Sequence, residues 1–347
     1  MKFFRIFLIS SIFLFDNSYT INDIVIREKY ANWKRKILRT SPGSQNSTIF
    51  LPSNTSEGFL NFKKSLMDIS KQNIKFLTGR SQFQMKLNIQ ASSSDAAKNI
   101  RNGFNPPKTS ENPSLSTSDS FDYQDITYLP PSLDYRDFGL VTEVRDQGYT
   151  CGSCYAFSAN CALEGQVAKY YGKLTALSEQ NIVDCSTSYG NKGCDYGYME
   201  AAFKYAKFNP GLANGTTYPY YGIDNQCQYT PQMLSAEISA YTFVPKDENI
   251  LKQALVDVGP LSIAIKADLN SIYYYTGGIY DDDNCRGTVN HAVCLVGYGT
   301  DNTTTPPTDY WIIKNSWSND WGENGFMKMK MGTNLCGITN YVIYPNI

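Results

Sequence analysis

The chain has 347 residues, of which 42% are hydrophobic and 18% are charged. These values are typical of a globular protein of one or two domains with a substantial core. The net charge of −1 gives no reason to expect a nucleic-acid partner. No stretch reaches the roughly 18 consecutive apolar residues of a membrane span, so we expect none.

The N-terminus has the pattern of a secretory signal peptide. Lys2 and Arg5 precede the apolar run 6–15, and polar residues follow. The apolar run is too short to cross a membrane, which is typical of a signal peptide. We place the signal peptide at residues 1–19, although no A-x-A pattern marks its end. A short buried helix is the alternative. Four N-x-[ST] sequons agree with secretory traffic and glycosylation; they begin at Asn46, Asn54, Asn214 and Asn302.

Charge divides the rest of the chain near residue 130. Residues 20–130 hold 15 Lys and Arg against 9 Asp and Glu, a balance of +6, whereas residues 131–347 hold 14 against 22, a balance of −8. We predict that the two parts attract each other, with chance imbalance as the alternative. Apolar residues spaced three to four apart predict a helix over 59–73. The stretch 92–120, rich in Ser, Asn, Pro and Lys, is expected to be an extended or mobile linker.

The predicted secondary structure of residues 131–347 changes from helices to strands along the chain. Its first half has helical patterns at 154–170, 178–185 (with Ser178 as N-cap) and 198–207. Its second half has strand patterns at 261–265, 291–299, 310–314 and 325–331. A helical lobe followed by a strand-rich lobe predicts an α+β architecture with a cleft between the lobes.

Nine cysteines all lie after residue 150. In an oxidising compartment most of them should pair, and the odd number leaves at least one thiol free. They are Cys151, Cys154, Cys161, Cys185, Cys194, Cys227, Cys285, Cys294 and Cys336.

Three residues have the pattern of nucleophilic catalysis. Cys154 stands at the start of a predicted helix, where the helix dipole stabilises a thiolate. His291 is the single histidine of the chain, so an imidazole partner for that thiolate can only be this one. Asn315 ends a predicted strand, and its amide could orient the ring of His291. Taken alone, His291 fits an ordinary buried histidine and Asn315 a turn residue; the joint pattern favours catalysis.

Residues 130–347 resemble the papain family of cysteine proteases, and most of all its cathepsin L-like members. The segment Cys151-Gly152-Ser153-Cys154-Tyr155 matches the family's cysteine motif, with His291 and Asn315 following 137 and 161 residues after Cys154. Further matching motifs keep the family's order: Asp134-Tyr135-Arg136, Leu177-Ser178-Glu179-Gln180-Asn181, Gly193-Cys194-Asp195, Asn290-His291-Ala292 and Lys314-Asn315-Ser316-Trp317.

The resemblance implies a papain-like two-lobe α+β fold, with a helical left lobe and a β-barrel-like right lobe. It implies an inhibitory helical pro-segment at 20–130 and a mature peptidase domain at 131–347. The expected activity is that of a cysteine endopeptidase made as a zymogen, acting on proteins or peptides, with its own pro-segment as inhibitor. No metal or other cofactor is implied. We expect a monomer in a lysosome, a digestive vacuole or the extracellular space.

The resemblance also assigns roles to residues. Cys154 is the nucleophile, His291 the base and Asn315 its orienting partner. Gln147 and the backbone N–H of Cys154 would bind the oxyanion, although one extra residue stands between Gly148 and Cys151 relative to the family pattern.

The resemblance also implies which residues form the main specificity pocket. This pocket binds the side chain of the second residue before the scissile bond (P2). Tyr341 would form its floor and take up depth, so P2 Val or Leu should fit better than Phe. Trp317 would border the leaving-group side. The remaining residues expected to bind substrate are Gly197, Tyr198, Met199, Ala264, Asn290 and Ala292.

Disulfides and pro-segment motifs complete the resemblance. The implied disulfides are Cys151–Cys194, Cys185–Cys227 and Cys285–Cys336, and the remaining Cys161 and Cys294 are expected to be buried thiols. In the pro-segment Phe62, Ile69, Asn73 and Asn88 fit the family's motifs, whereas Asn54, Gly58, Gln90 and Ser92 depart from them.

The sequence leaves two alternatives to a protease. A secreted cysteine-rich binding protein or an inactive relative would explain the cysteines, but no catalytic residue of the pattern is missing. Zinc at Cys151 and Cys154 would need further ligands, and the sequence has no second close cysteine pair and one histidine. An endopeptidase is favoured over an exopeptidase, because the exopeptidases of the family carry an extra histidine loop or a disulfide-tethered pro-segment fragment.

Overall fold

A computed structural model describes residues 23–40, 56–106 and 129–347. The expected signal peptide, the sequons at Asn46 and Asn54, and the last part of the expected linker lie outside the described residues. Within the described part, no helix combines the length and the apolar character that crossing a membrane requires.

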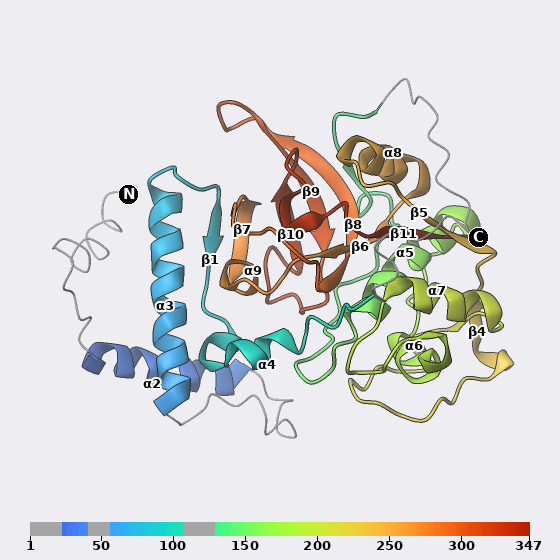
Figure 1. Ribbon diagram of the computed structural model, residues 1–347, viewed down its shortest axis with the longest axis horizontal. Coiled ribbons are helices and arrows are strands. Elements are labelled where there is room, and N and C mark those ends of the chain that lie inside the picture. The colour runs from blue at the N-terminus through green and yellow to red at the C-terminus, as the bar shows by residue number, and fades with distance from the viewer. Residues whose placement is uncertain (1–22, 41–55, 107–128) are drawn as a thin grey trace.

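The N-terminal segment is mainly helical. Helix α2 (Asp23–Thr40) crosses the long helix α3 (Ser56–Leu77), which confirms the helix expected over 59–73 (Figure 1). The two helices meet through aromatic side chains: the ring centroid of Phe62 lies 4.9 Å from that of Tyr30 and 5.1 Å from that of Trp33. Phe62 is fully buried, so the apolar spacing seen in the sequence forms the contact face of α3.

Asn73 holds the next element against α3. Its side-chain amide donates to the carbonyl oxygen of Met85 and its side-chain oxygen accepts from the N–H of Met85, both at 2.9 Å. Met85 ends strand β1 (Phe83–Met85), which pairs antiparallel with β7 (Tyr275–Tyr280) of the C-terminal domain. The N-terminal segment therefore extends the sheet of the domain.

The stretch from Ser92 to Pro106 is not a free linker. After the short 3₁₀ helix η2 (Ile89–Ser92), helix α4 (Asp95–Asn99) is capped by the side chain of Ser94. Beyond α4, Arg101 and Phe104 are 2% and 3% exposed. The expectation of a mobile linker is wrong for this part, because these side chains are buried against the domain.

The helical lobe follows the sequence prediction closely. Its helices are α5 (Cys154–Tyr171), α6 (Glu179–Cys185) and α7 (Met199–Phe208). The side-chain oxygen of Ser178 accepts from the N–H of Asn181 at 2.9 Å, which confirms the expected N-cap. Helix α5 is buried over most of its length, because the other elements of both lobes surround it.

The strand-rich lobe is an open sheet and not a closed barrel. Its strand order is β1-β7-β10-β9-β8-β6-β11-β5, with β2 attached to β8, and the end strands β1 and β5 do not pair. The expectation of a barrel-like lobe is corrected accordingly, because the sheet is extended by a strand from the N-terminal segment at one end. The remaining strands are β2 (Leu133–Asp134), β3 (Leu212–Ala213), β4 (Leu234–Ala236), β5 (Ala240–Phe243), β6 (Leu261–Ile265), β8 (His291–Asp301), β9 (Thr308–Lys314), β10 (Phe326–Lys330) and β11 (Val342–Asn346). The remaining helices are α8 (Glu248–Val258), α9 (Asn270–Tyr273), and the 3₁₀ helices η4 (Thr187–Tyr189), η5 (Pro231–Met233) and η6 (Leu335–Gly337).

Four disulfides link the described residues. Three of them match the expected pairs: Cys151–Cys194, Cys185–Cys227 and Cys285–Cys336. The fourth joins Cys161 to Cys294, so the expectation of two free buried thiols is wrong. Helix α5 packs on strand β8 and brings the two Cα atoms to 6.2 Å, a separation that a disulfide spans.

Candidate active site

Cys154 lies where the two lobes meet. It is the first residue of α5 and is fully buried, and it is the free cysteine among the described residues. Its sulfur accepts a hydrogen bond from the backbone N–H of Ala292 at 3.4 Å. The start of α5 is thereby held against the start of β8, whose first residue is His291.

The imidazole of His291 is hydrogen-bonded to the side chain of Asn315. Its Nε2 lies 2.9 Å from Oδ1 of Asn315, which also accepts from the N–H of Ser316 at 2.8 Å. Because Oδ1 is an acceptor, Nε2 carries the proton and Nδ1 is left as the second functional nitrogen. Nδ1 is buried without a hydrogen-bond partner. The indole ring of Trp317 packs against the imidazole with centroids 4.7 Å apart and shields this pair from water.

Burial keeps both groups neutral in this state. It raises the pKa of the Cys154 thiol to about 12, although backbone amides of Ala292, Gly103, Tyr155 and Cys154 itself act in the opposite direction. It lowers the pKa of His291 to about 4, against the hydrogen bond with Asn315. A reactive thiolate therefore requires that the covering segment leave and water or charge reach the site.

The buried side chain of Gln147 contacts the N-terminal segment, the cysteine motif and Ser316. Its Nε2 donates to the carbonyl oxygens of Arg101 at 3.1 Å and Cys151 at 3.0 Å, and its Oε1 accepts from the hydroxyl of Ser316 at 2.7 Å. The chain turns directly after Gln147, at Gly148, whose φ is +79°.

The N-terminal segment crosses the site and blocks it. The N–H of Gly197 donates to the carbonyl oxygen of Gly103 at 2.8 Å, and Asn105 donates to the carbonyl oxygen of Gly197 at 3.0 Å. A Cβ atom added at Gly103 would lie 1.8 Å from the carbonyl oxygen of Gly152, two residues before Cys154. Only glycine allows the segment to pass this close to Cys154.

Phe104 occupies the expected specificity pocket. Its ring meets that of Tyr341 edge to face with centroids 4.9 Å apart. Of the residues expected to bind substrate, Tyr198, Met199, Ala264 and Ala292 belong to the same buried cluster as Phe104 and Tyr341. A pocket that holds a phenyl ring beside Tyr341 argues against the expected order of Val or Leu before Phe.

Asn290 contacts the N-terminal segment through its backbone. Its carbonyl oxygen accepts from the N–H of Phe104 at 3.2 Å, while its side-chain oxygen accepts from the N–H of Ala267 at 2.8 Å. The side chain is thus engaged within its own lobe.

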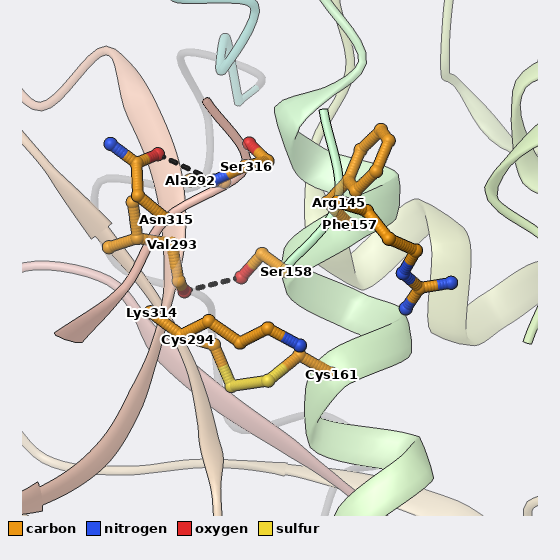
Figure 2. Close-up of a pocket in the computed structure, with 10 residues that line it drawn as sticks. All are labelled: Arg145, Phe157, Ser158, Cys161, Ala292, Val293, Cys294, Lys314, Asn315 and Ser316. Atoms are coloured by element: carbon orange, nitrogen blue, oxygen red, sulfur yellow. Dashed lines mark hydrogen bonds between the residues drawn. A yellow bond between two sulfur atoms is a disulfide. The ribbon is translucent and has the colours of Figure 1, made fainter. Parts of the chain in front are cut away.

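A small cavity lies behind the site, between α5 and the strands β8 and β9 (Figure 2). The disulfide Cys161–Cys294 lies beside it, and the hydroxyl of Ser158 donates to the carbonyl oxygen of Val293 at 2.6 Å. Burial lowers the pKa of Lys314 on its wall to about 8. The sequence analysis did not predict this disulfide. The available signal was the number of cysteines: without Cys154, eight remain, which is enough for four disulfides.

Comparison with known proteins agrees with this geometry. A model of the family "Papain family cysteine protease" matches residues 129–346. Cathepsin L of Sarcophaga peregrina is 39% identical over 297 residues, which cover 82% of this chain and 85% of that protein. Cathepsin 7 of Mus musculus is 46% identical over 219 residues, which cover 62% of this chain and 66% of that protein. The structure of digestive procathepsin L 3 of the Tenebrio molitor larval midgut superposes with a TM-score of 0.79 at 33% identity, over 92% of this chain and 99% of that one.

Proposed function

Because the chain belongs to the papain family of cysteine proteases and is a cathepsin L-like proenzyme, we propose that it is an endopeptidase that uses Cys154 as nucleophile, His291 as acid–base and Asn315 as orienting group. The observation that carries the proposal is the contact of Cys154 at the start of α5 with the start of β8, where His291 is bonded to Asn315.

The first half of the reaction forms an acyl-enzyme. With the pro-segment gone, the proton of Cys154 passes to His291, and the thiolate attacks the carbonyl carbon of the scissile bond. The oxyanion accepts hydrogen bonds from Nε2 of Gln147 and from the backbone N–H of Cys154. The imidazolium of His291 then protonates the departing amine as the C–N bond breaks, which leaves a thioester on Cys154.

The second half releases the acid. His291 removes a proton from a water molecule, whose oxygen attacks the thioester carbonyl. The same two donors stabilise the second oxyanion, and the C–S bond breaks to give a carboxylic acid and the free cysteine. Asn315 keeps the imidazole aimed at sulfur throughout, because its oxygen holds Nε2.

Residues 20–130 are the proposed inhibitory pro-segment, and 131–347 the mature domain. The carbonyl oxygen of Arg101 takes the hydrogen bond of Gln147 that an oxyanion would need. The backbone of Phe104 pairs in parallel with Gly197. Four disulfides support passage through the secretory pathway to a lysosome, a digestive vacuole or the outside of the cell.

A thiol-directed epoxide tests the proposal. After maturation, the enzyme should be labelled at Cys154 and should lose all hydrolysis of peptides blocked at both ends. The matched variant Cys154→Ser should be neither labelled nor active. An inactive binding homologue would leave the blocked peptides intact, and strict removal of terminal residues would disprove the endopeptidase assignment.

A further inference from the structure

Arg101 of the pro-segment is held in a slot that the catalytic scheme does not use. Its guanidinium carbon lies 4.4 Å from the ring centroid of Tyr149 and 5.0 Å from that of Trp317. One of its terminal nitrogens lies 2.8 Å from a carboxylate oxygen of Asp146. Two aromatic faces and one carboxylate thus enclose a planar cation whose side chain is 3% exposed.

The peptidase domain builds this slot by itself. Asp146 forms a β-bridge with Trp317, and the N–H of Gln147 donates to the carbonyl oxygen of Ser316 at 2.9 Å. The carboxylate of Asp146 also accepts from the N–H of Gly148 at 3.0 Å, at the turn that leads to Tyr149. Tyr149 belongs to the stretch that is one residue longer than the family pattern. Asp146 and Trp317 are therefore held in position by contacts within the domain.

The slot and the Tyr341 pocket are filled by residues that flank Gly103 in the chain. Gly103 contacts Cys154, and Phe104, the next residue, fills the Tyr341 pocket. Arg101, two residues before Gly103, contacts Trp317, which also covers His291. Because the Tyr341 pocket takes the acyl part of the substrate in the proposed function, the slot faces the leaving-group part.

We propose that the slot formed by Asp146, Tyr149 and Trp317 binds an arginine or lysine side chain of the substrate within the first two residues after the scissile bond. The proposal rests on the proposed function and extends it to a substrate class. Arginine should be preferred over lysine, because a planar guanidinium stacks between two rings while it pairs with a carboxylate. The pro-segment closes the same slot with Arg101 until it is released.

Two sets of blocked, internally quenched peptides test this on the enzyme matured from the full chain. Each set carries arginine or its neutral isostere citrulline at the first or the second position after the scissile bond. We expect kcat/KM to be about 10-fold higher for arginine than for citrulline in at least one set. Asp146→Asn and Tyr149→Leu should each reduce this ratio to within about twofold of unity. A ratio of one in the wild type, or a high ratio that both variants retain, would overturn the proposal.

Two control variants guard against a general loss of charge or of aromatic surface. Asp283→Asn removes a carboxylate that is 95% exposed, and Tyr171→Leu removes a tyrosine that is 66% exposed. Both should keep the arginine-to-citrulline ratio of the wild type. A fall of the ratio in either control to the level of Asp146→Asn would contradict a local slot.

Binding of a pro-segment peptide separates this proposal from the proposed function. The Cys154→Ala variant, matured by an added protease, is titrated with the peptide of residues 95–106 carrying either arginine or citrulline at position 101. Citrulline should weaken binding about 10-fold, and Asp146→Asn should abolish the difference. This result needs no catalysis, so it holds even if no substrate is cleaved. Equal affinities of the two peptides would disprove the slot while leaving peptide hydrolysis unaffected.

Discussion

The disulfide between Cys161 and Cys294 links the helix that begins at Cys154 to the strand that begins at His291. It lies seven residues along α5 from Cys154 and three residues along β8 from His291. It therefore joins the two lobes covalently close to the proposed catalytic pair, and both cysteines lie in a cluster with Val296 and Ile312.

Removing this bond by Cys161→Ala with Cys294→Ala should lower the melting temperature of the mature enzyme by about 5–15 °C. The bond closes a separation of 133 residues, against 42 for Cys185–Cys227. In the chain-entropy model the longer loop stabilises by about 1 kcal/mol more, from 1.5RT ln(133/42). Cys185→Ala with Cys227→Ala is thus the control and should lose less. Thiol titration of the unfolded, unreduced wild type should find one reactive thiol; three would contradict the bond.

The Phe104–Tyr341 contact predicts which P2 side chain the mature enzyme prefers. Because the pocket holds a phenyl ring edge to face with Tyr341, peptides with P2 Phe should be cleaved at least as well as those with P2 Val. Tyr341→Leu should lower the Phe-to-Val ratio of kcat/KM by about 2- to 10-fold, the value of an aromatic pair. The exposed Tyr221, changed to Leu, serves as control. A strong preference for Val in the wild type would restore the expectation drawn from the sequence.

Cys154 should react with iodoacetamide in different ways before and after maturation. In the proenzyme its pKa is raised to about 12, so the thiolate fraction and the rate should rise about tenfold per pH unit between pH 6 and 9. In the mature enzyme the thiolate paired with His291 should react fast and almost independently of pH over that range until the imidazolium loses its proton. Mass spectrometry of the alkylated peptide measures both rates. A slow but flat profile in the proenzyme would mean that reaction occurs only after transient release.

His291→Ala should reduce kcat of the mature enzyme by at least about 10³-fold, because no second histidine can replace it. Asn315→Ala should be milder, up to about 100-fold, because it disturbs orientation. The hydrogen bond with Asn315 raises the pKa of His291, so its loss should move the alkaline limb of the pH–rate profile to lower pH. An unshifted limb would show that Asn315 has only a structural role.

Charge should make maturation depend on pH and salt. The balance of +6 on residues 20–130 and −8 on residues 131–347 favours association at neutral pH, and protonation of carboxylates below about pH 5 weakens it. We expect faster maturation in acid and, at neutral pH, faster maturation at about 0.5 M salt than at low salt. Appearance of the mature chain on a gel measures both. Rates that ignore salt would contradict the electrostatic explanation.

The sequence alone determined the parts that depend on local order. The N-cap at Ser178, the start of α5 at Cys154 and the strand that begins at His291 follow from residue type and periodicity over a few neighbours. The spaced motifs then placed Cys154, His291 and Asn315 in one family pattern.

Only the tertiary structure decided what covers the site and how the lobes are joined. Arg101 lies in a stretch whose composition resembles a linker, and its burial comes from Asp146, Tyr149 and Trp317 of the other part of the chain. Cys161 and Cys294 had no pairing signal beyond their number, because a helix residue and a strand residue 133 positions apart meet only when the lobes pack. Local propensities do not encode such contacts; the packing of α5 against β8 does.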